Sequence, residues 1–172
     1  MVKGGIKKMV PSEELKEAFS VKYERYGDML FKQCMVYLGN HIEAEEVMQE
    51  VFIKLIYKAP KFSTIEDEKR WVIRVTINLC KDRLKSFWRK KVISIEEIEL
   101  YAKSEEEINL TEFILKLPYK YKTVIHLYYY EGYKVKEIAE ILKIRESAVK
   151  MRLKRGREIL KMEVTNSEEG RL

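Results

Sequence analysis

Glycine and proline are scarce in this chain, whose 172 residues include only 7 Gly and 3 Pro. Sandwiches, barrels and glycine-looped nucleotide folds need many tight turns, so this scarcity argues against them. Hydrophobic residues make up 46% and charged residues 36% of the chain, a mixture typical of packed amphipathic helices. A chain of this length forms one domain of average size or two small ones. The sequence therefore predicts an all-α fold.

Cysteine and histidine are also rare, with two of each. Cys34 and Cys80 fall within apolar helical patterns and are too few for a disulfide framework, which favours a reducing cytoplasm. His41 and His126 are far from each other and from both cysteines in the sequence, whereas a zinc site needs several ligands at short spacing. We expect ordinary structural roles for all four residues, and no metal or other cofactor.

Long hydrophobic runs are missing as well, since no stretch of 18 apolar residues occurs. The first 11 residues are basic, but no apolar stretch follows them. This pattern predicts neither a signal peptide nor membrane insertion. The expected location is the cytoplasm.

Charge is plentiful and unevenly distributed. The 34 Lys and Arg exceed the 28 Asp and Glu by six, so polyanions are the natural partners. Residues 71 to 91 carry seven basic groups against one acidic group, residues 92 to 114 carry seven acidic groups against one basic group, and residues 143 to 161 carry eight basic groups against two acidic ones. Solvated helix faces would explain any one of these blocks, but together they form a bipartite basic pattern.

Apolar residues recur every three or four positions from residue 15 to 38, which predicts one helix, or two helices interrupted at Gly27. A second helix is expected from about residue 42 to 58, with Asn40 as its capping residue and Glu43 reaching back. The expected buried positions are Leu15, Phe19, Tyr23, Tyr26, Leu30, Cys34 and Leu38 in the first stretch, and Val47, Val51, Phe52 and Leu55 in the second.

A third helix is expected from about residue 67 to 90. Pro60 ends the preceding helix, and Ser63 with Glu66 is the expected cap of the new one. Its apolar side is predicted to consist of Trp71, Val75, Leu79 and Leu84.

The rest of the chain predicts a linker and three more helices. Residues 92 to 110 are expected to form an acidic linker between two domains. Helices are expected from Pro118 to about residue 130, ending at Gly132, then from 136 to 142 and from about 145 to 162. The polar tail, residues 164 to 172, is expected to be disordered.

The last two predicted helices have the shape of a helix-turn-helix. Ala139 is small where the helices must cross, and Val149 and Leu153 anchor the second helix. A helix of this kind meets base edges and phosphates in the major groove with its outer side. That side carries Lys150, Met151, Lys154, Arg155 and Arg157. A basic amphipathic helix on an ordinary helical bundle is the alternative.

Two separate parts of the chain carry sequence motifs. The first part has residues 44 to 52 (AEEVMQEVF), 71 to 78 (WVIRVTIN) and 81 to 83 (KDR), and the second has Leu117 and Pro118, residues 137 to 139 (EIA) and 149 to 155 (VKMRLKR). These motifs resemble regions 2 and 4, respectively, of the bacterial RNA polymerase sigma factors of the sigma-70 family, in its small extracytoplasmic-function (ECF) type. The resemblance covers residues 20 to 162.

This resemblance implies a dissociable sigma subunit with no catalytic activity, which docks on core RNA polymerase at the β′ clamp helices and the β flap. It also implies recognition of the promoter minus-thirty-five and minus-ten elements, promotion of DNA melting, and an anti-sigma factor as partner. The implied division is a region 2 domain at residues 12 to 91, the linker at 92 to 110, a region 4 domain at 111 to 163, and the tail at 164 to 172.

Two other functions compete with this interpretation. A stand-alone helix-turn-helix regulator would bind operators as a dimer, but it leaves the docking-like helix and the second basic helix unexplained. A helical-bundle enzyme would need a Glu-x-x-His spacing, which neither histidine has.

The resemblance also implies the site residues. The residues implied to contact core polymerase are Glu45, Glu46, Gln49 and Glu50. The alternative interpretation is that they form an acidic helix face exposed to solvent. In the minus-ten site, Phe62, Ser63 and Thr64 receive an unstacked base, Asn78 contacts bases or backbone, and Lys81, Arg83, Lys85, Arg89 and Lys90 hold phosphates. Minus-thirty-five recognition falls on Lys150, Met151, Arg152, Lys154, Arg155 and Arg157. Phe62 is equally compatible with the core, and Trp71 is expected there, whereas Trp88 stays open between core packing and stacking on bases.

The chain departs from the family pattern in the helix-turn-helix. Lys143 stands where glycine is usual and must adopt a costly backbone conformation or shift the turn. Ser147 and Ala148 replace the usual Gly-Thr, which removes a hydroxyl that would contact phosphate. Met151 replaces a small polar residue, and its thioether favours an apolar contact such as a thymine methyl.

Overall fold

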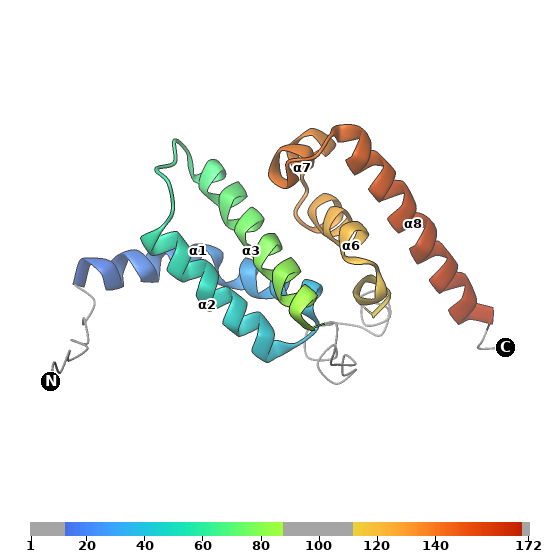
Figure 1. Ribbon diagram of the computed structural model, residues 1–172, viewed down its shortest axis with the longest axis horizontal. Helices are drawn as coiled ribbons and strands as arrows, with labels where there is room; N and C mark the ends of the chain where they lie inside the picture. Colours follow the sequence, from blue (N-terminus) through green and yellow to red (C-terminus); the bar gives the residue numbers. More distant parts are fainter. Residues whose placement is uncertain (1–12, 88–111, 170–172) are drawn as a thin grey trace, which may run out of the picture.

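A computed structural model describes residues 13–87 and 112–169, and the regular structure of these residues is helical throughout. The first part of the chain forms α1 (Glu13–Leu38), α2 (His41–Tyr57) and α3 (Ile65–Phe87), and the second part forms α6 (Tyr119–Ile125), η1 (His126–Tyr130), α7 (Val135–Leu142) and α8 (Glu146–Glu169) (Figure 1). The predicted all-α fold with two helical domains is confirmed. The expected linker, Trp88, Arg89 and Lys90 lie outside the described residues.

Helix α1 is continuous through Gly27, which is buried within it. Its buried side includes Tyr26, Leu30, Cys34 and Tyr37, so the helix is buried mainly in its second half. The predicted stripe is wrong at its start, because the side chains of Phe19 and Tyr23 are 44% and 47% exposed. Both rings contact the ring of Phe52 on α2, at 5.5 Å and 5.4 Å between centroids, and are otherwise partly exposed to solvent.

Helix α2 follows its prediction closely. Asn40 precedes its first turn, and the Asn40 Oδ1 accepts a hydrogen bond of 2.9 Å from the Glu43 backbone N–H. This satisfies one of the donors that a helix start leaves unpaired. The four expected core positions, Val47, Val51, Phe52 and Leu55, are all buried.

Helix α3 starts two residues earlier than predicted, at Ile65. The cap is Thr64, whose Oγ1 accepts a 3.0 Å hydrogen bond from the Asp67 N–H, so the expected cap by Ser63 with Glu66 is wrong. The predicted apolar side is also displaced. Its four residues, Trp71, Val75, Leu79 and Leu84, are half-buried at the edge, and the fully buried face contains Val72, Ile73, Thr76, Ile77 and Cys80.

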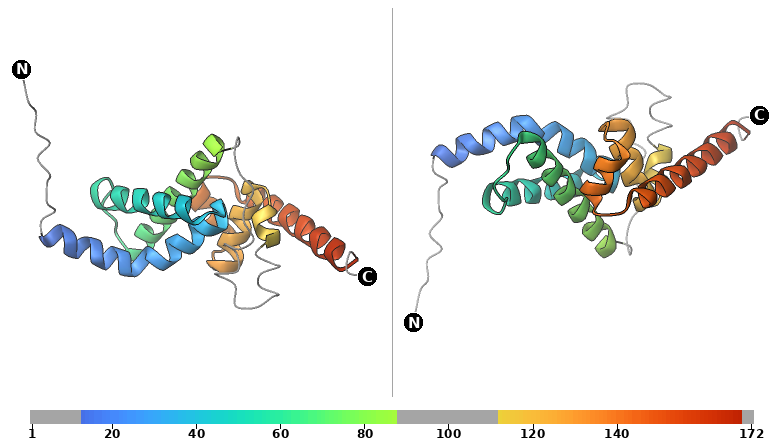
Figure 2. Two further views of the ribbon diagram at one scale, coloured as in Figure 1. Left: turned by 90° about the horizontal axis from the view of Figure 1, so that it is seen from below. Right: turned by 90° about the horizontal axis from the view of Figure 1, so that it is seen from above.

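The displacement has a simple cause, because α3 packs against partners on more than one side. It contacts α1 and α2 in the first part of the chain and α7 in the second part. Figure 1 shows α3 between α1 and α2 on one side and α6 and α7 on the other, and Figure 2 shows the same helices from two further sides. A helix with partners on two sides buries two adjoining faces, and no single stripe describes it.

The second part is built around a tight turn. Lys143 adopts the left-handed conformation (φ 53°, ψ 48°), as expected for the residue that replaces glycine. The Ile144 N–H then donates to the Ala139 carbonyl at 3.0 Å and closes the end of α7. Helix α8 continues to Glu169, so the expectation of a disordered tail from residue 164 is wrong as far as residue 169.

Helix α8 approaches α6 closely at Gly156. A Cβ atom at this buried position would lie 3.0 Å from the Ile125 Cγ1, which is tighter than most Cβ contacts, so Ile125 would have to shift by a few tenths of an ångström. Glycine at this position therefore fits the packing of α8 on α6, and no turn is involved.

One buried apolar core joins the two parts of the chain. The ring of Tyr37 on α1 lies 5.4 Å from that of Tyr119 and 5.5 Å from that of His126, measured between centroids. The Tyr119 hydroxyl donates to the Ile77 carbonyl on α3 at 2.5 Å. The two predicted domains therefore pack directly on each other.

Candidate nucleic-acid interface

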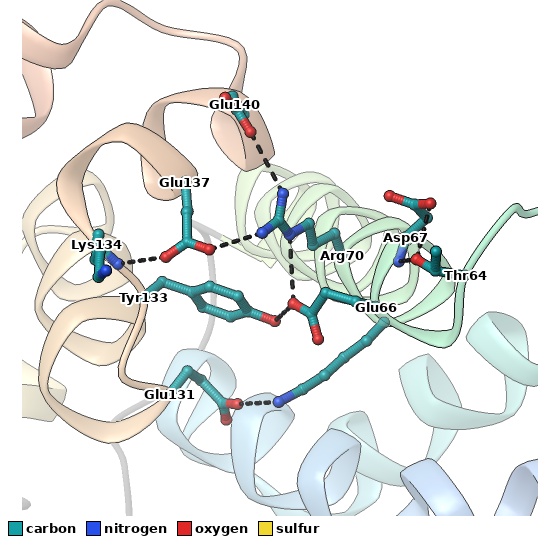
Figure 3. Close-up of polar contacts among 10 residues, drawn as sticks. Thr64, Glu66, Asp67, Arg70, Glu131, Tyr133, Lys134, Glu137 and Glu140 are labelled. Atoms are coloured by element: carbon teal, nitrogen blue, oxygen red, sulfur yellow. Dashed lines mark hydrogen bonds and ion pairs between the residues drawn. The ribbon is translucent and has the colours of Figure 1, made fainter.

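Polar side chains of α3 meet the segment that leads into α7 and α7 itself (Figure 3). Arg70 is at the centre: its Nη2 lies 2.7 Å from Glu137 Oε1, its Nη1 lies 3.4 Å from Glu140 Oε2, and its Nε lies 3.3 Å from Glu66 Oε1. Burial opposes the charge of Arg70, but the hydrogen bond to Glu66 and the charges of all three carboxylates outweigh it and raise the pKa of the guanidinium. We call this cluster of Glu66, Arg70, Glu137 and Glu140 the Arg70 clasp.

Two further contacts lie beside the Arg70 clasp. The Tyr133 hydroxyl donates to Glu66 Oε1 at 3.2 Å, and Lys69 Nζ lies 3.5 Å from Glu131 Oε2. The Lys69 ammonium also lies 5.5 Å from the centroid of the Tyr133 ring. All of these contacts connect the first part of the chain with the second.

A cavity of about 300 Å³ opens next to the Arg70 clasp. The loop before α3 and α3 itself contribute two aromatic rings, Phe62 and Trp71, whose centroids are 5.7 Å apart. We call it the Phe62 pocket; it is lined by Pro60, Phe62, Asp67, Arg70, Trp71, Arg74, Glu140 and Ile141. Phe62 and Trp71 are half-buried and pack against the core, so neither ring is fully in it.

Of the other described residues expected to contact minus-ten DNA, some are exposed and others already have partners within the protein. Asn78, Lys81 and Lys85 are exposed on α3, and Ser63 is exposed in the loop before it. Arg83 is engaged, because its Nη1 lies 2.8 Å from Glu46 Oε2 and 3.4 Å from Glu43 Oε2. Thr64 is exposed but serves as the cap of α3.

The four residues expected to dock on polymerase lie along α2. Glu45, Glu46 and Gln49 are exposed, whereas Glu50 is half-buried and lies 3.3 Å from Lys54 Nζ. Sequence reasoning missed the apolar groove beside them, which has a volume of about 430 Å³. The groove is lined mainly by aromatic and aliphatic side chains of α1 and α2, among them Phe19, Tyr23, Met48, Phe52, Ile53 and Tyr57, and by Gln49 at its polar rim. Its signal in the sequence was the aromatic start of the α1 stripe.

Helix α8 presents the basic face that was expected from its pattern. Lys150, Met151, Lys154, Arg155 and Arg157 are exposed, and the Met151 side chain is 58% exposed. Val149 and Leu153 are buried beneath them. Arg152 is half-buried, so it stands at the edge of this face.

Three buried polar groups in the core of the second part were not singled out from the sequence as unusual. Lys122 Nζ donates to the Leu115 carbonyl at 2.7 Å, and burial lowers the pKa of this ammonium to about 8. Burial also lowers the pKa of His126 to about 4, and its Nδ1 has no hydrogen-bond partner. The hydroxyl of Thr123 donates to the Tyr119 carbonyl at 2.8 Å.

The two cysteines lie together in the first part, with their sulfur atoms 4.0 Å apart, as buried free thiols. Burial raises the pKa of Cys80, which keeps it protonated and unreactive. Within residues 13–87 and 112–169, no cluster of three or more His, Cys, Asp or Glu could hold a metal ion. No helix in the same ranges is both long and apolar enough to cross a membrane.

Two family models match the chain. The model for sigma-70 region 2 matches residues 23–90, and the model for sigma-70 region 4 matches residues 107–160. The chain is 31% identical to the ECF RNA polymerase sigma factor SigW of Bacillus subtilis, over 95% of this chain and 97% of SigW. It is 28% identical to the RNA polymerase sigma factor SigV of the same organism, over 80% of this chain and 86% of SigV.

Two solved structures share the fold. CnrH, in complex with the cytosolic domain of CnrY, superposes with a TM-score of 0.66 at 20% identity, over 88% of this chain and 90% of CnrH. RpoE of Bartonella quintana, in complex with the anti-sigma factor NepR, superposes with a TM-score of 0.67 at 15% identity, over 87% of this chain and 98% of RpoE.

Proposed function

The chain belongs to the sigma-70 family as an ECF sigma factor, a subunit of RNA polymerase, and from this premise we propose which surfaces perform each step of initiation. Sigma factors are non-catalytic subunits, so each step is binding or a change of conformation. The single observation that carries the proposal is the exposed basic face of α8 above the buried Val149 and Leu153.

We propose that α2 docks on the β′ clamp helices of core polymerase. Its exposed Glu45 and Gln49 offer acceptors to basic groups, Glu46 exchanges its ion pair with Arg83 for a basic group of polymerase, and the apolar groove beside Gln49 accepts aliphatic side chains. An apolar centre with a polar rim is the usual composition of a protein interface. We propose that the second part of the chain binds the β flap of core polymerase.

We propose that α8 reads the minus-thirty-five element from the major groove. Its long basic side chains reach base edges and phosphates, and Met151 supplies an apolar contact. In the minus-ten element, Asn78, Lys81 and Lys85 contact DNA along α3, and the Phe62 pocket receives an unstacked base. A site that binds only the unstacked base favours melted DNA over duplex by its differential affinity.

One further partner, the domain division and the location complete the proposal. Two of the solved structures that share this fold are complexes, one with CnrY and one with the anti-sigma factor NepR, which supports an anti-sigma factor as a partner of this chain. We propose a division into a region 2 domain (12 to 91), a linker (92 to 110) and a region 4 domain (111 to 163); the order of the two family models, which match residues 23–90 and 107–160, supports it. We assign the protein to the cytoplasm, where RNA polymerase acts.

Run-off transcription with purified core polymerase on genomic fragments tests this function. Discrete transcripts that require the added chain are expected. Replacing Lys150 and Lys154 with Ala should remove these transcripts while binding to core persists, since these residues lie on α8 and not on α2. Tight operator binding by a dimer, with no transcript in the presence of core, would support the stand-alone regulator instead.

A further inference from the structure

The Phe62 pocket has the chemistry of a site for single-stranded nucleic acid. Phe62 and Trp71 provide faces on which a base stacks, and Arg70 and Arg74 provide positive charge for the adjoining phosphates. Aromatic rings beside a basic groove are the recurring composition of such sites. All four of these residues lie in the first part of the chain. Arg70 was not among the residues that the sequence pattern assigned to DNA.

The opposite wall of the same pocket belongs to the second part of the chain. Glu140 and Ile141 of α7 line it, and Glu140 approaches Arg70 to 3.4 Å. Glu137, one turn earlier on α7, lies 2.7 Å from the same guanidinium. Two carboxylates therefore occupy the donor groups with which Arg70 would bind phosphate, since guanidinium groups bind both anions in the same way.

We infer that the described arrangement is a closed state in which α7 blocks the minus-ten site, with Glu137 and Glu140 standing in for DNA phosphates on Arg70. This inference rests on the proposed function of the Phe62 pocket. In the closed state a strand of DNA and α7 compete for one guanidinium and one cavity. Arg70 is a phosphate-contacting residue of the open state.

The inference requires a reciprocal relation between closure and DNA binding. If the two exclude each other, weakening the closed state must strengthen binding of single-stranded DNA by the free protein. Binding of DNA must in turn detach α7 from α3. Each exposed ion pair shifts such an equilibrium by about 1.4- to 5-fold, so two pairs shift it by roughly 2- to 30-fold.

The double variant E137Q/E140Q tests the first relation. A glutamine side chain at position 137 still accepts the hydrogen bond that Glu137 Oε2 receives from the Lys134 N–H at 2.9 Å, so the start of α7 keeps its cap. The probe is a fluorescein-labelled pool of single-stranded DNA of random sequence, about 20 nucleotides long, because stacking sites tolerate any base. Fluorescence anisotropy is expected to report a dissociation constant roughly 2- to 30-fold lower than that of the wild type.

Two matched controls separate opening from a change in net charge. E17Q/E24Q removes the same two negative charges from exposed positions on α1 and should stay within about twofold of the wild type. In the E137Q/E140Q background, R70A should abolish the gain in affinity for single-stranded DNA. K32A, which removes a positive charge from α1, should retain most of that gain. Equal gains in E137Q/E140Q and E17Q/E24Q, or a gain that survives R70A, would overturn the inference.

A measurement on the wild type tests the second relation without any variant. Hydrogen exchange of the amides of α7 should become faster when the oligonucleotide pool saturates the protein. Unchanged or slower exchange there would refute competition between DNA and α7. Neither experiment uses core polymerase, so run-off transcription tests the proposed function separately. If the chain directs transcription but DNA and α7 do not compete, the proposed function stands and only the inferred closed state is wrong.

Discussion

Thr64 and Asp67 form a reciprocal pair at the start of α3. The Thr64 Oγ1 accepts from the Asp67 backbone N–H at 3.0 Å, and the same hydroxyl donates to Asp67 Oδ2 at 2.8 Å. The pair lies between the two aromatic residues of the Phe62 pocket, since Phe62 precedes it in the loop and Trp71 follows it on α3, and Asp67 itself lines the pocket.

We predict that Thr64→Ala lowers the free energy of unfolding by about 0.5–2 kcal/mol, because one helix donor loses its acceptor. Ser63→Ala, one residue earlier and exposed, should change it by less than about 0.5 kcal/mol. Urea denaturation followed by circular dichroism measures both. A larger loss for Ser63→Ala than for Thr64→Ala would restore the cap that the sequence pattern suggested.

We predict that burial of His126 makes the protein less stable in acid. Its pKa lies near the ordinary value of 6.5 in the unfolded chain and at about 4 in the folded one, so the unfolded chain binds the proton more readily. The contribution is fully present above pH 6.5 and is lost as the pH falls toward 4, in total about 3 kcal/mol.

His126→Phe isolates this effect, because phenylalanine does not titrate. Urea denaturation across the same pH range should show a shallower loss of stability for the variant than for the wild type. The pKa of Glu68 is lowered in the folded protein, so its charge also contributes stability that is lost as the pH falls. The wild-type curve alone therefore does not show which of the two residues causes the loss. Parallel curves for the two proteins would show that His126 is not its source.

We predict that replacing Glu46 and Gln49 with Ala weakens binding to core polymerase and leaves the helical content unchanged. Both side chains are exposed on α2, beside the buried residues that hold it in place. Pull-down with core polymerase measures the binding, and circular dichroism measures the fold. Glu17→Ala with Glu24→Ala is the matched control on α1. Unchanged affinity in the Glu46 and Gln49 variant would remove this part of α2 from the docking surface.

We predict that Met151→Ser changes which upstream bases are preferred. A base-edge contact contributes about 1–3 kcal/mol of discrimination, whereas a phosphate contact mainly sets the dependence on salt. Lys161→Ala, farther along α8, should weaken all promoters evenly or have no effect. Selection from a randomised upstream element by transcription with each variant measures the preference. An unaltered preference with Met151→Ser and a shifted one with Lys161→Ala would place the reading face elsewhere on α8.

Much of the local structure was determined by the sequence alone. The α2 stripe, the Asn40 cap and the exposed basic face of α8 all follow from spacings of a few residues. Hydrogen bonds and side-chain contacts within a helix join positions three or four apart, so a pattern of that period carries the information. The same locality explains why the sequence pattern predicts a helix-turn-helix.

Helix ends were less well determined. Helix α8 runs to Glu169 although residues 163 to 169 have no clear apolar stripe. An existing helix extends at little cost, since nucleation and not propagation is unfavourable, so the end of an apolar pattern does not mark the end of a helix.

Only the tertiary structure decided which faces meet. Arg70 and Glu137 are 67 positions apart, and the sequence offers many carboxylates that Arg70 could have met. The rotation of the buried face of α3 has the same origin, because α7 packs against it from the other half of the chain. The tight space at Gly156 likewise arises only because Ile125 lies against it. Long-range contacts depend on how whole helices pack, and neither the period of a pattern nor the sign of a charge specifies the partner.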